Sequence, residues 1–210
     1  MSRTLEVTDR TRVRRKPGRG SHERAVIDQI LDEALVCHVA FVGHGAPVVL
    51  PTTQVRVDDA IYVHGSAASH MLRTLAGGVD VSVAVTLIDG LVLSRTAFHH
   101  SVNYRSVVLF GRAALVEEPA LKRRAFAALV DKLVAGRSSA CRPPNDAELA
   151  ATQLLALPIE EASAKIRTGP PLADEGEDAA LPYWAGVIPL HTTHGAPITA
   201  PDCTRPFDGH

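Results

Sequence analysis

The sequence predicts a mainly β domain with flanking helices, folded as an antiparallel barrel. Short β-rich runs follow one another between residues 36 and 116, and their connections are too short for the helix that each parallel crossover requires. Closing such a sheet into a barrel also removes exposed strand edges. Hydrophobic residues make up 46% of the 210-residue chain and aromatic residues only 4%, so Val, Leu, Ile and Ala must fill the core.

An amphipathic helix opens the domain. Apolar residues recur at three- and four-residue spacing, and Ser21 is available as the N-cap (Val26, Ile27, Ile30, Leu31, Ala34 and Leu35). The β-rich runs that follow cover residues 36–42, 47–57 and 60–63, separated by the turn-forming triplet Gly43-His44-Gly45 and the pair Asp58-Asp59.

The second half of the chain repeats this alternation. A short helix is predicted at residues 66–75, followed by strands at 79–88, 91–99 and 104–116, with Asp89-Gly90 as a hairpin turn. Helical spacing then predicts helices at 119–134 and 146–155, and a returning strand at 159–167.

The chain is predicted to contain one domain, residues 21–190, between two terminal segments. Residues 1–20 form a basic flexible arm, which is either a solvated or subunit-crossing tail or a phosphate-contacting segment. Residues 191–210 contain little to bury and are expected to be loosely ordered.

Charge and cysteine content limit the partners and the compartment. The 22 Lys and Arg residues balance 23 Asp and Glu residues, so we expect no nucleic-acid or membrane partner. The three cysteines lack CxxC spacing and the N-terminus lacks an apolar signal stretch, which predicts a cytoplasmic protein.

Residues 62–73 run from a strand end through small residues into a helix. Small residues allow close approach to the backbone, and the first N–H groups of a helix attract anions, so this segment is a candidate phosphate cradle. Its polar residues Ser66, Ser69, His70 and Arg73 can donate hydrogen bonds. The alternative is that the Ser and Gly residues serve only helix capping.

Arg105 is predicted to share one face of its strand with the apolar residues Val107 and Leu109, so it requires an anion, either a carboxylate of the fold or a bound phosphate. The adjacent residues His99 and His100 point to opposite faces of a strand and have no acidic or Cys residues at ligand spacing nearby, so no metal site is predicted. The sequence also contains no GxSxG, GxGxxG or Walker motif.

Taken in order, several segments of the chain resemble the flavin-nucleotide-binding branch of the pyridoxamine 5′-phosphate oxidase-like proteins, which are relatives of the nitroimidazole-resistance proteins. The resemblance extends over about residues 11–190 and rests on these segments: His38-Val39-Ala40-Phe41, Leu50-Pro51-Thr52-Thr53, Tyr62-Val63-His64-Gly65-Ser66, Ser69-His70-Met71-Leu72, Val85-Thr86-Leu87-Ile88-Asp89-Gly90-Leu91-Val92-Leu93, Asn103-Tyr104-Arg105-Ser106-Val107, Ala162-Ser163-Ala164-Lys165-Ile166-Arg167-Thr168-Gly169-Pro170 and Trp184-Ala185-Gly186-Val187-Ile188-Pro189.

This resemblance implies an antiparallel split β-barrel of the FMN-binding type, a homodimer with one FMN per subunit at the subunit interface. It implies a flavin bordered by Thr52, Thr53, His64, Gly65 and Ser66, with Ser69, His70 and Met71 at its phosphate end, Arg105 and Ser106 adding polar contacts, and Lys165, Arg167 and Trp184 from the partner or a lid. Relatives commonly carry Arg where this chain has His70, which predicts weaker, pH-dependent phosphate binding.

The expected function is an FMN-dependent oxidoreductase acting on a small aromatic, nitro or vitamin-B6-like substrate. No side chain is assigned as catalytic, because the cofactor carries the chemistry in such enzymes. A non-catalytic flavin-binding or flavin-buffering protein is the alternative, and a haem-binding protein using His64 or His99 is the third.

Overall fold

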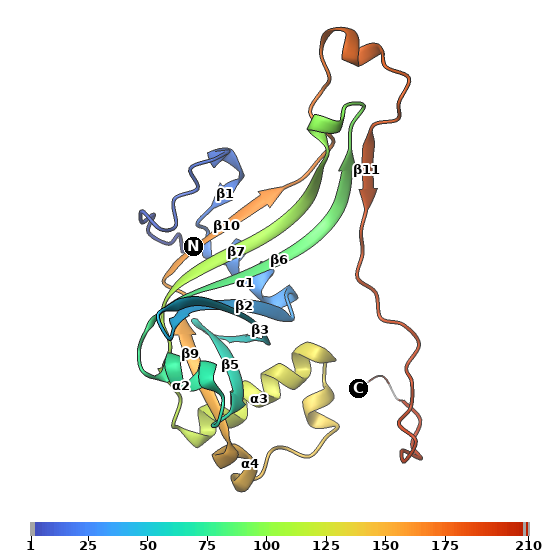
Figure 1. The fold of residues 1–210 in the computed structure, drawn as a ribbon. Helices are drawn as coiled ribbons and strands as arrows, with labels where there is room; N and C mark the ends of the chain where they lie inside the picture. Colours follow the sequence, from blue (N-terminus) through green and yellow to red (C-terminus); the bar gives the residue numbers. More distant parts are fainter. Residues whose placement is uncertain (1–2, 208, 210) are drawn as a thin grey trace.

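The computed structural model describes residues 3–207 and 209, and it confirms the predicted split barrel (Figure 1). Two antiparallel sheets form the barrel. The larger sheet contains, in spatial order, β1 (Gly20–Ser21), β10 (Glu161–Arg167), β7 (Ser101–Arg112), β6 (Asp80–Leu93), β2 (Val36–Gly43) and β3 (Ala46–Thr53), with β11 (Gly186–Pro189) paired to the second half of β6. The smaller sheet contains β4 (Val55–Val57), β5 (Ala60–Ser66), β9 (Thr152–Pro158) and β8 (Ala114–Leu115).

Helices flank the barrel. They are α1 (Arg24–Glu33), α2 (His70–Ala76), α3 (Pro119–Leu133) and α4 (Asp146–Ala151), with short 3-10 turns η1 (Pro17–Arg19), η2 (Ala97–His99), η3 (Arg137–Ser139) and η4 (Gly176–Ala180). Helix α1 contacts β4, β6, β7 and β10, while α3 contacts β4 (Figure 1). Within the part of the chain that the structure describes, no helix has the length and apolar character needed to span a membrane.

Aliphatic side chains fill the barrel, as the low aromatic content predicts. Val39, Val85, Leu109 and Leu155 are almost completely buried, and Phe41 is the aromatic residue of this main core cluster. β-Branched residues pack well on a pleated surface, so a core of this composition favours strands.

Strand β6 is one long strand, and the predicted hairpin at Asp89-Gly90 is wrong. The pairing of β6 with β7 shifts register between Ile88 and Gly90, which leaves Asp89 in a β-bulge. A Cβ on Gly90 would lie 3.0 Å from Val187 Cγ1 and 3.1 Å from the Ile188 carbonyl oxygen, so glycine here allows β11 to approach β6 rather than forming a turn. The actual connection between β6 and β7 contains η2.

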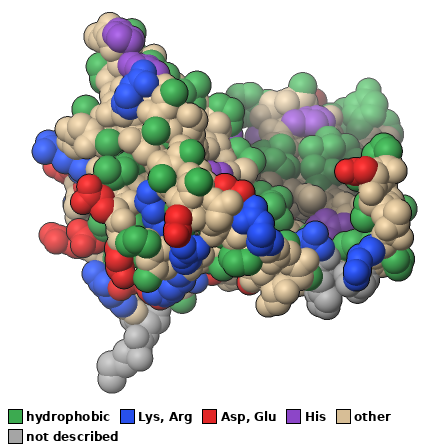
Figure 2. Space-filling model, turned by 90° about the horizontal axis from the view of Figure 1, so that it is seen from below, with side chains coloured by type: hydrophobic (Ala, Val, Ile, Leu, Met, Phe, Trp, Pro, Cys, Tyr) green, Lys and Arg blue, Asp and Glu red, His purple; other side chains and the backbone are tan. Residues whose placement is uncertain are grey.

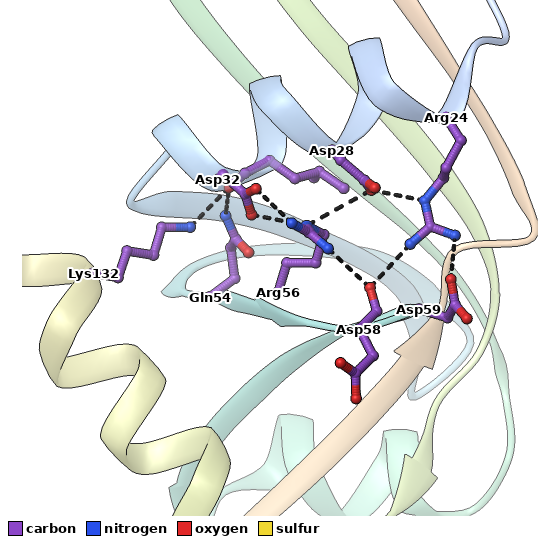
Figure 3. A network of polar contacts seen from close by, with 9 residues as sticks. Arg24, Asp28, Asp32, Gln54, Arg56, Asp58, Asp59 and Lys132 are labelled. Carbon is purple, nitrogen blue, oxygen red and sulfur yellow. Dashed lines mark hydrogen bonds and ion pairs between the residues drawn. The ribbon is translucent and has the colours of Figure 1, made fainter. Parts of the chain in front are cut away.

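Gln54 interrupts the strand predicted at residues 47–57 and separates β3 from β4. Its side chain is completely buried, and its Nε2 donates to the carbonyl oxygens of Leu31 (2.7 Å) and Ala34 (2.5 Å) at the end of α1. The Lys132 ammonium donates to the same Leu31 oxygen at 2.8 Å. Figure 3 shows how this contact continues into an ionic network that joins α1 to the β4–β5 hairpin through Arg24, Asp28, Asp32, Arg56, Asp58 and Asp59.

Several element boundaries differ from the predictions. Helix α1 begins after Glu23, and Ser21 is not its N-cap. Helix α2 begins only at His70, because Ser69 is its N-cap and its Oγ accepts from the Leu72 N–H. The helix predicted at 146–155 ends at Ala151, and the rest of that segment forms β9, whose side chains Leu154 and Leu155 enter the core.

The N-terminal segment lies against the barrel, contrary to the expected flexible arm. In the described range 3–20, Leu5 and Thr11 are buried, and the Leu5 N–H donates to the His22 carbonyl oxygen. Arg10 pairs with Glu161 of β10, so this arginine is not available to a phosphate. Residues 1 and 2 lie outside the described residues.

Candidate functional site

Hydroxyl groups and one lysine form a row across the outer face of the larger sheet. Thr86 is opposite Ser106 in the β6–β7 pair, and Ser106 is opposite Lys165 in the β7–β10 pair. At the other end, Thr53 is opposite Val36 in the β2–β3 pair. The pairing of β2 with β6 ends with His38 opposite Ala84, and Val36 and Thr86 lie two residues beyond this pair on the same face. Directly opposite residues in antiparallel strands share a face, so these side chains line one strip.

This strip is accessible, and its charge is uncompensated. Thr53, Ser106 and Lys165 are half-buried and Thr86 is exposed. The Ser106 hydroxyl donates to the Lys165 carbonyl oxygen at 3.1 Å. Among the described residues, none forms a hydrogen bond or ion pair with the Lys165 ammonium. The sequence prediction found Thr53, Ser106 and Lys165 and missed Thr86, although Thr86 is in phase with the outward-facing Ala84.

Arg105 points to the opposite face of the sheet from Ser106, so the two cannot contact one ligand. Its guanidinium donates to Asp89 (2.7 and 3.0 Å) and to Glu33 at the end of α1 (2.7 Å for one of two bonds). These carboxylates raise the pKa of Arg105, with Glu33 as the larger cause. The anion of Arg105 is therefore a pair of carboxylates of the fold, the first of the two alternatives left open by the sequence, while a contact of Arg105 with the flavin stays a prediction.

Arg167 is also held by the protein. It is buried, and its guanidinium donates to the Asn103 side chain and to the carbonyl oxygens of Gly169 (3.2 Å) and Pro170 (3.1 Å). Burial lowers its pKa. These bonds hold the Arg167 guanidinium against the turn after β10, and its expected contact with the cofactor stays a prediction. Trp184, by contrast, is 63% exposed and lies two residues before β11, where its ring closely approaches Gly186.

The turn from β5 into α2 is explained largely by capping and packing. The Ser66 Oγ accepts from the Ala68 N–H at 3.2 Å, and Arg73 donates to the Ala68 carbonyl oxygen at 2.7 Å. Met71 is buried in the main core cluster, which accounts for its place in this turn, and its expected position at the phosphate end of a flavin stays a prediction. A Cβ on Gly65 would lie 3.0 Å from Leu72 Cδ1, so glycine allows α2 to pack close to β5. The capping explanation left open by the sequence therefore accounts for most of this segment.

Thr52 lies on β3 and His64 on β5, two strands that contact each other. Thr52 is opposite the completely buried Cys37 and faces the barrel side, away from Thr53. The His64 ring meets Phe126 of α3 edge-on, with centroids 5.6 Å apart, and burial lowers its pKa. A neutral imidazole here has packing as its main contact.

His70 and His44 form a stacked pair beside this turn. Their ring centroids are 4.6 Å apart with an interplanar angle of 8°, and Phe41 lies 6.5 Å from the His70 ring. Both side chains are exposed, and neither ring forms a hydrogen bond with any residue in the described ranges. Ring nitrogens without hydrogen bonds are available to a ligand, a proton or a metal ion.

His99 is held differently, by a buried carboxylate. Its Nδ1 lies 3.3 Å from Asp174, whose side chain is 2% exposed and also accepts from Ser94 and Arg95. These contacts connect the β6–β7 turn to the loop before η4. Across residues 3–207 and 209, no group of three His, Cys, Asp or Glu side chains is arranged to hold a metal ion.

A model of the family described as pyridoxamine 5′-phosphate oxidase matches residues 23–166. No protein with a curated description matches the sequence. The fold also matches solved structures, and two of them share substantial sequence identity over most of both chains.

The flavocytochrome Anf3 from Azotobacter vinelandii is 39% identical, with a TM-score of 0.85 over 95% of this chain and 94% of that one. The FAD- and haem-binding protein from Mycobacterium smegmatis is 41% identical, with a TM-score of 0.82 over 88% and 90%. A putative 5-nitroimidazole antibiotic resistance protein from Bacteroides thetaiotaomicron, 17% identical with a TM-score of 0.58 over 70% and 86%, shares the fold alone.

Proposed function

Because this chain belongs to the pyridoxamine 5′-phosphate oxidase family, we propose that it is a flavin-binding oxidoreductase whose cofactor lies on the outer face of the larger sheet. The row of Thr53, Thr86, Ser106 and Lys165 is the observation that carries this proposal. An ammonium without an intramolecular partner suits a phosphate, and neighbouring hydroxyls suit the polyol chain of a flavin. A bound flavin supplies hydride and electron transfer, while the protein positions it and excludes water.

The same face supports a homodimer. Exposed apolar side chains continue along it from the hydroxyl row, and the register keeps them on one side: Val36, Val49, Ile88, Leu91, Val102 and Ile188. Contiguous apolar surface of this kind marks an interaction site in soluble proteins. A second subunit seated here would enclose the flavin and bring its own Trp184 toward the ring, as the resemblance implies.

We propose FAD ahead of the FMN expected from the resemblance. A terminal phosphate monoester such as that of FMN concentrates a charge of about −2 at neutral pH, which calls for more than one cation. Arg105 and Arg167 are both committed to intramolecular partners, which leaves Lys165. A diphosphate divides the same charge over two phosphates. The relative from Mycobacterium smegmatis, described as binding FAD, also supports this choice.

The test is direct. We expect the purified full chain to be yellow, to release FAD on denaturation, and to lose the flavin absorbance near 450 nm when mixed anaerobically with NADH or NADPH. Mass spectrometry of the released cofactor decides between FAD and FMN. A colourless protein without affinity for either flavin would contradict the proposal. Flavin that binds but is not reduced would favour the alternative, a flavin-binding or flavin-buffering protein. The substrate proposed remains a small aromatic, nitro or vitamin-B6-like compound, to be found by screening acceptors.

A second candidate function is a flavin protein that also holds haem, as two relatives are described. The stacked pair of His44 and His70 favours it, because the lone pair of a neutral imidazole is a common haem iron ligand. His70 suits this role better than His64 or His99, because the His64 ring packs against Phe126 and His99 is bound through Nδ1 to Asp174. A bound haem supplies one-electron chemistry.

Haem titration of the full chain tests this candidate through its Soret band. We expect His70→Ala to abolish the shifted band of the bound haem, and His99→Ala to leave it unchanged. Loss of the band in His99→Ala, with retention in His70→Ala, would contradict the assignment.

A further inference from the structure

The C-terminal segment, residues 190–207, follows β11 and forms no further helix or strand in the described residues. In Figure 1 it continues from the end of β11, beside the second half of β6, as an extended chain toward the end of the molecule where α3 and α4 lie. The Leu190 N–H donates to the Asp89 carbonyl oxygen at 3.1 Å. Beyond that residue, the backbone hydrogen bond found in the segment is local, from the Cys203 N–H to the Ala200 carbonyl oxygen at 3.0 Å.

Apolar side chains of this segment lie in water in the single subunit. Ile198 is 97% exposed, and Phe207 and Leu190 are also exposed. An extended chain without backbone partners has little to offset its conformational entropy unless its apolar side chains are buried against something.

A hollow lies between the segment and α3. It has a volume of about 720 Å³ and is lined by Leu133 and Val134 of α3 and by Ile198 and Phe207 of the segment. Figure 2 shows the hollow from below, with hydrophobic side chains on its walls. Protein interiors are close-packed, so an open space of this size between mostly apolar walls is not a close-packed intramolecular contact.

We propose that the C-terminal segment is an arm that wraps around the second copy of this chain in the homodimer. The proposal rests on the homodimer described above and names what its arm contacts. The exposed apolar side chains on the outer face of β6 and β11 end at Ile188, just before the segment begins. The arm therefore continues a surface that a partner subunit would cover. Residues 191–207 can span up to about 55 Å when extended, enough to cross a small domain.

The composition of the arm also favours a protein partner. Asp202 and Arg205 balance each other, and no cluster of Lys or Arg is present between residues 190 and 207, so the arm has no attraction for nucleic acid or an anionic membrane. Ile198 and Phe207 instead match an apolar protein surface such as the exposed face of β2 and β3 that includes Val42 and Val49.

Photo-crosslinking of the full chain tests the arm. The crosslinking residue p-benzoylphenylalanine is placed at Ile198, and light and 15N-labelled subunits are mixed before irradiation. We expect covalent dimers that join a light to a heavy subunit. The matched control carries the same residue at Leu115, an exposed position of β8 on the smaller sheet, and should give few such products. Crosslinks confined to one subunit within a proven dimer would overturn the arm and leave the homodimer intact. A monomer by light scattering would overturn both, while flavin binding is measured separately by absorbance.

A second measurement does not depend on crosslinking. The double substitution Ile198→Ser with Phe207→Ser changes two exposed side chains, so the barrel should fold normally, as judged by circular dichroism. We expect the dissociation constant of the dimer to rise at least tenfold by sedimentation equilibrium. A constant within twofold of that of the unchanged protein would overturn the proposal.

Discussion

Replacement of Arg105 by Met separates a structural role from a cofactor-binding role. Arg105 joins the sheet to the end of α1 through Asp89 and Glu33, and its side chain is three-quarters buried. Methionine keeps most of the side-chain volume and removes the charge. The partly buried Asp89 then loses its bidentate partner, and the more exposed Glu33 loses the same partner.

The expected loss of stability follows from these exposures. A charge-assisted bond at a mostly buried site contributes about 1.5–3 kcal/mol, whereas an exposed pair contributes about 0–1 kcal/mol. We therefore expect Arg105→Met to lower the free energy of unfolding of the flavin-free protein by about 2 kcal/mol, measured by urea denaturation. Flavin affinity, measured by fluorescence titration, should stay within about twofold, because Arg105 faces away from the hydroxyl row.

The pH dependence provides an internal check. The bond from Arg105 lowers the pKa of Glu33 below 4.5, so this carboxylate stabilises the folded state above that pH and loses its contribution as the pH falls through its folded pKa. The difference between the two proteins should therefore shrink below about pH 4.5.

Lys165→Met is the matched control, and the opposite pattern is expected. Flavin affinity should fall about 10- to 100-fold, as for a lost charge-assisted bond to phosphate, with stability changed by less than about 0.5 kcal/mol. If Arg105→Met weakened flavin binding tenfold with unchanged stability, the assignment of Arg105 to the fold would be wrong.

Three further predictions follow from the described contacts. Burial lowers the pKa of Lys132 to about 8, so between about pH 8 and 10.5 the unfolded state binds more protons than the folded state. Across this range the free energy of unfolding of the native protein should rise by about 1.5 kcal/mol relative to that of Lys132→Met, allowing for partial exposure. Urea denaturation at a series of pH values measures this difference. Gly65→Ala should lower the stability by about 1–2 kcal/mol, read as a lower midpoint of thermal unfolding, because its Cβ would press on Leu72. Asn145→Ala removes one half of the capping box of α4 and should cost about 1 kcal/mol in urea denaturation, while Asp202→Ala, an exposed control, should cost nothing measurable.

The sequence was sufficient for the fold class because its signals are local. Helical spacing predicts α1 and α3 closely, and the β-rich runs predict an antiparallel barrel. Errors arise where a local signal has a non-local cause. Asp89-Gly90 has the composition of a hairpin turn, yet Gly90 makes room for β11, a strand almost a hundred residues later in the chain. Gln54 ends β3 because the end of α1 offers carbonyl oxygens, which no pattern around Gln54 reveals.

The candidate site was predictable only in part, for a related reason. Strand alternation states which neighbours share a face, but it does not state which face the cofactor occupies. Arg105 and Ser106 were therefore assigned together, although adjacent strand residues point to opposite sides. Lys165 and Ser106 meet because β10 pairs with β7 in one particular register, across 59 residues of sequence.

The candidate cofactor contacts are brought together by the register of strand pairing and not by a contiguous sequence motif. The small residues between His64 and Met71 have the composition of a phosphate cradle, yet capping by Ser69, the close approach at Gly65 and burial of Met71 account for them. The residues of the hydroxyl row are not contiguous in the sequence, because each comes from a different strand. A change of one residue in the pairing of β7 with β10 would turn Lys165 to the other face and remove the row while leaving every motif intact. Cofactor retention in this protein should therefore respond more sharply to substitutions that shift this register than to substitutions in the turn from β5 to α2.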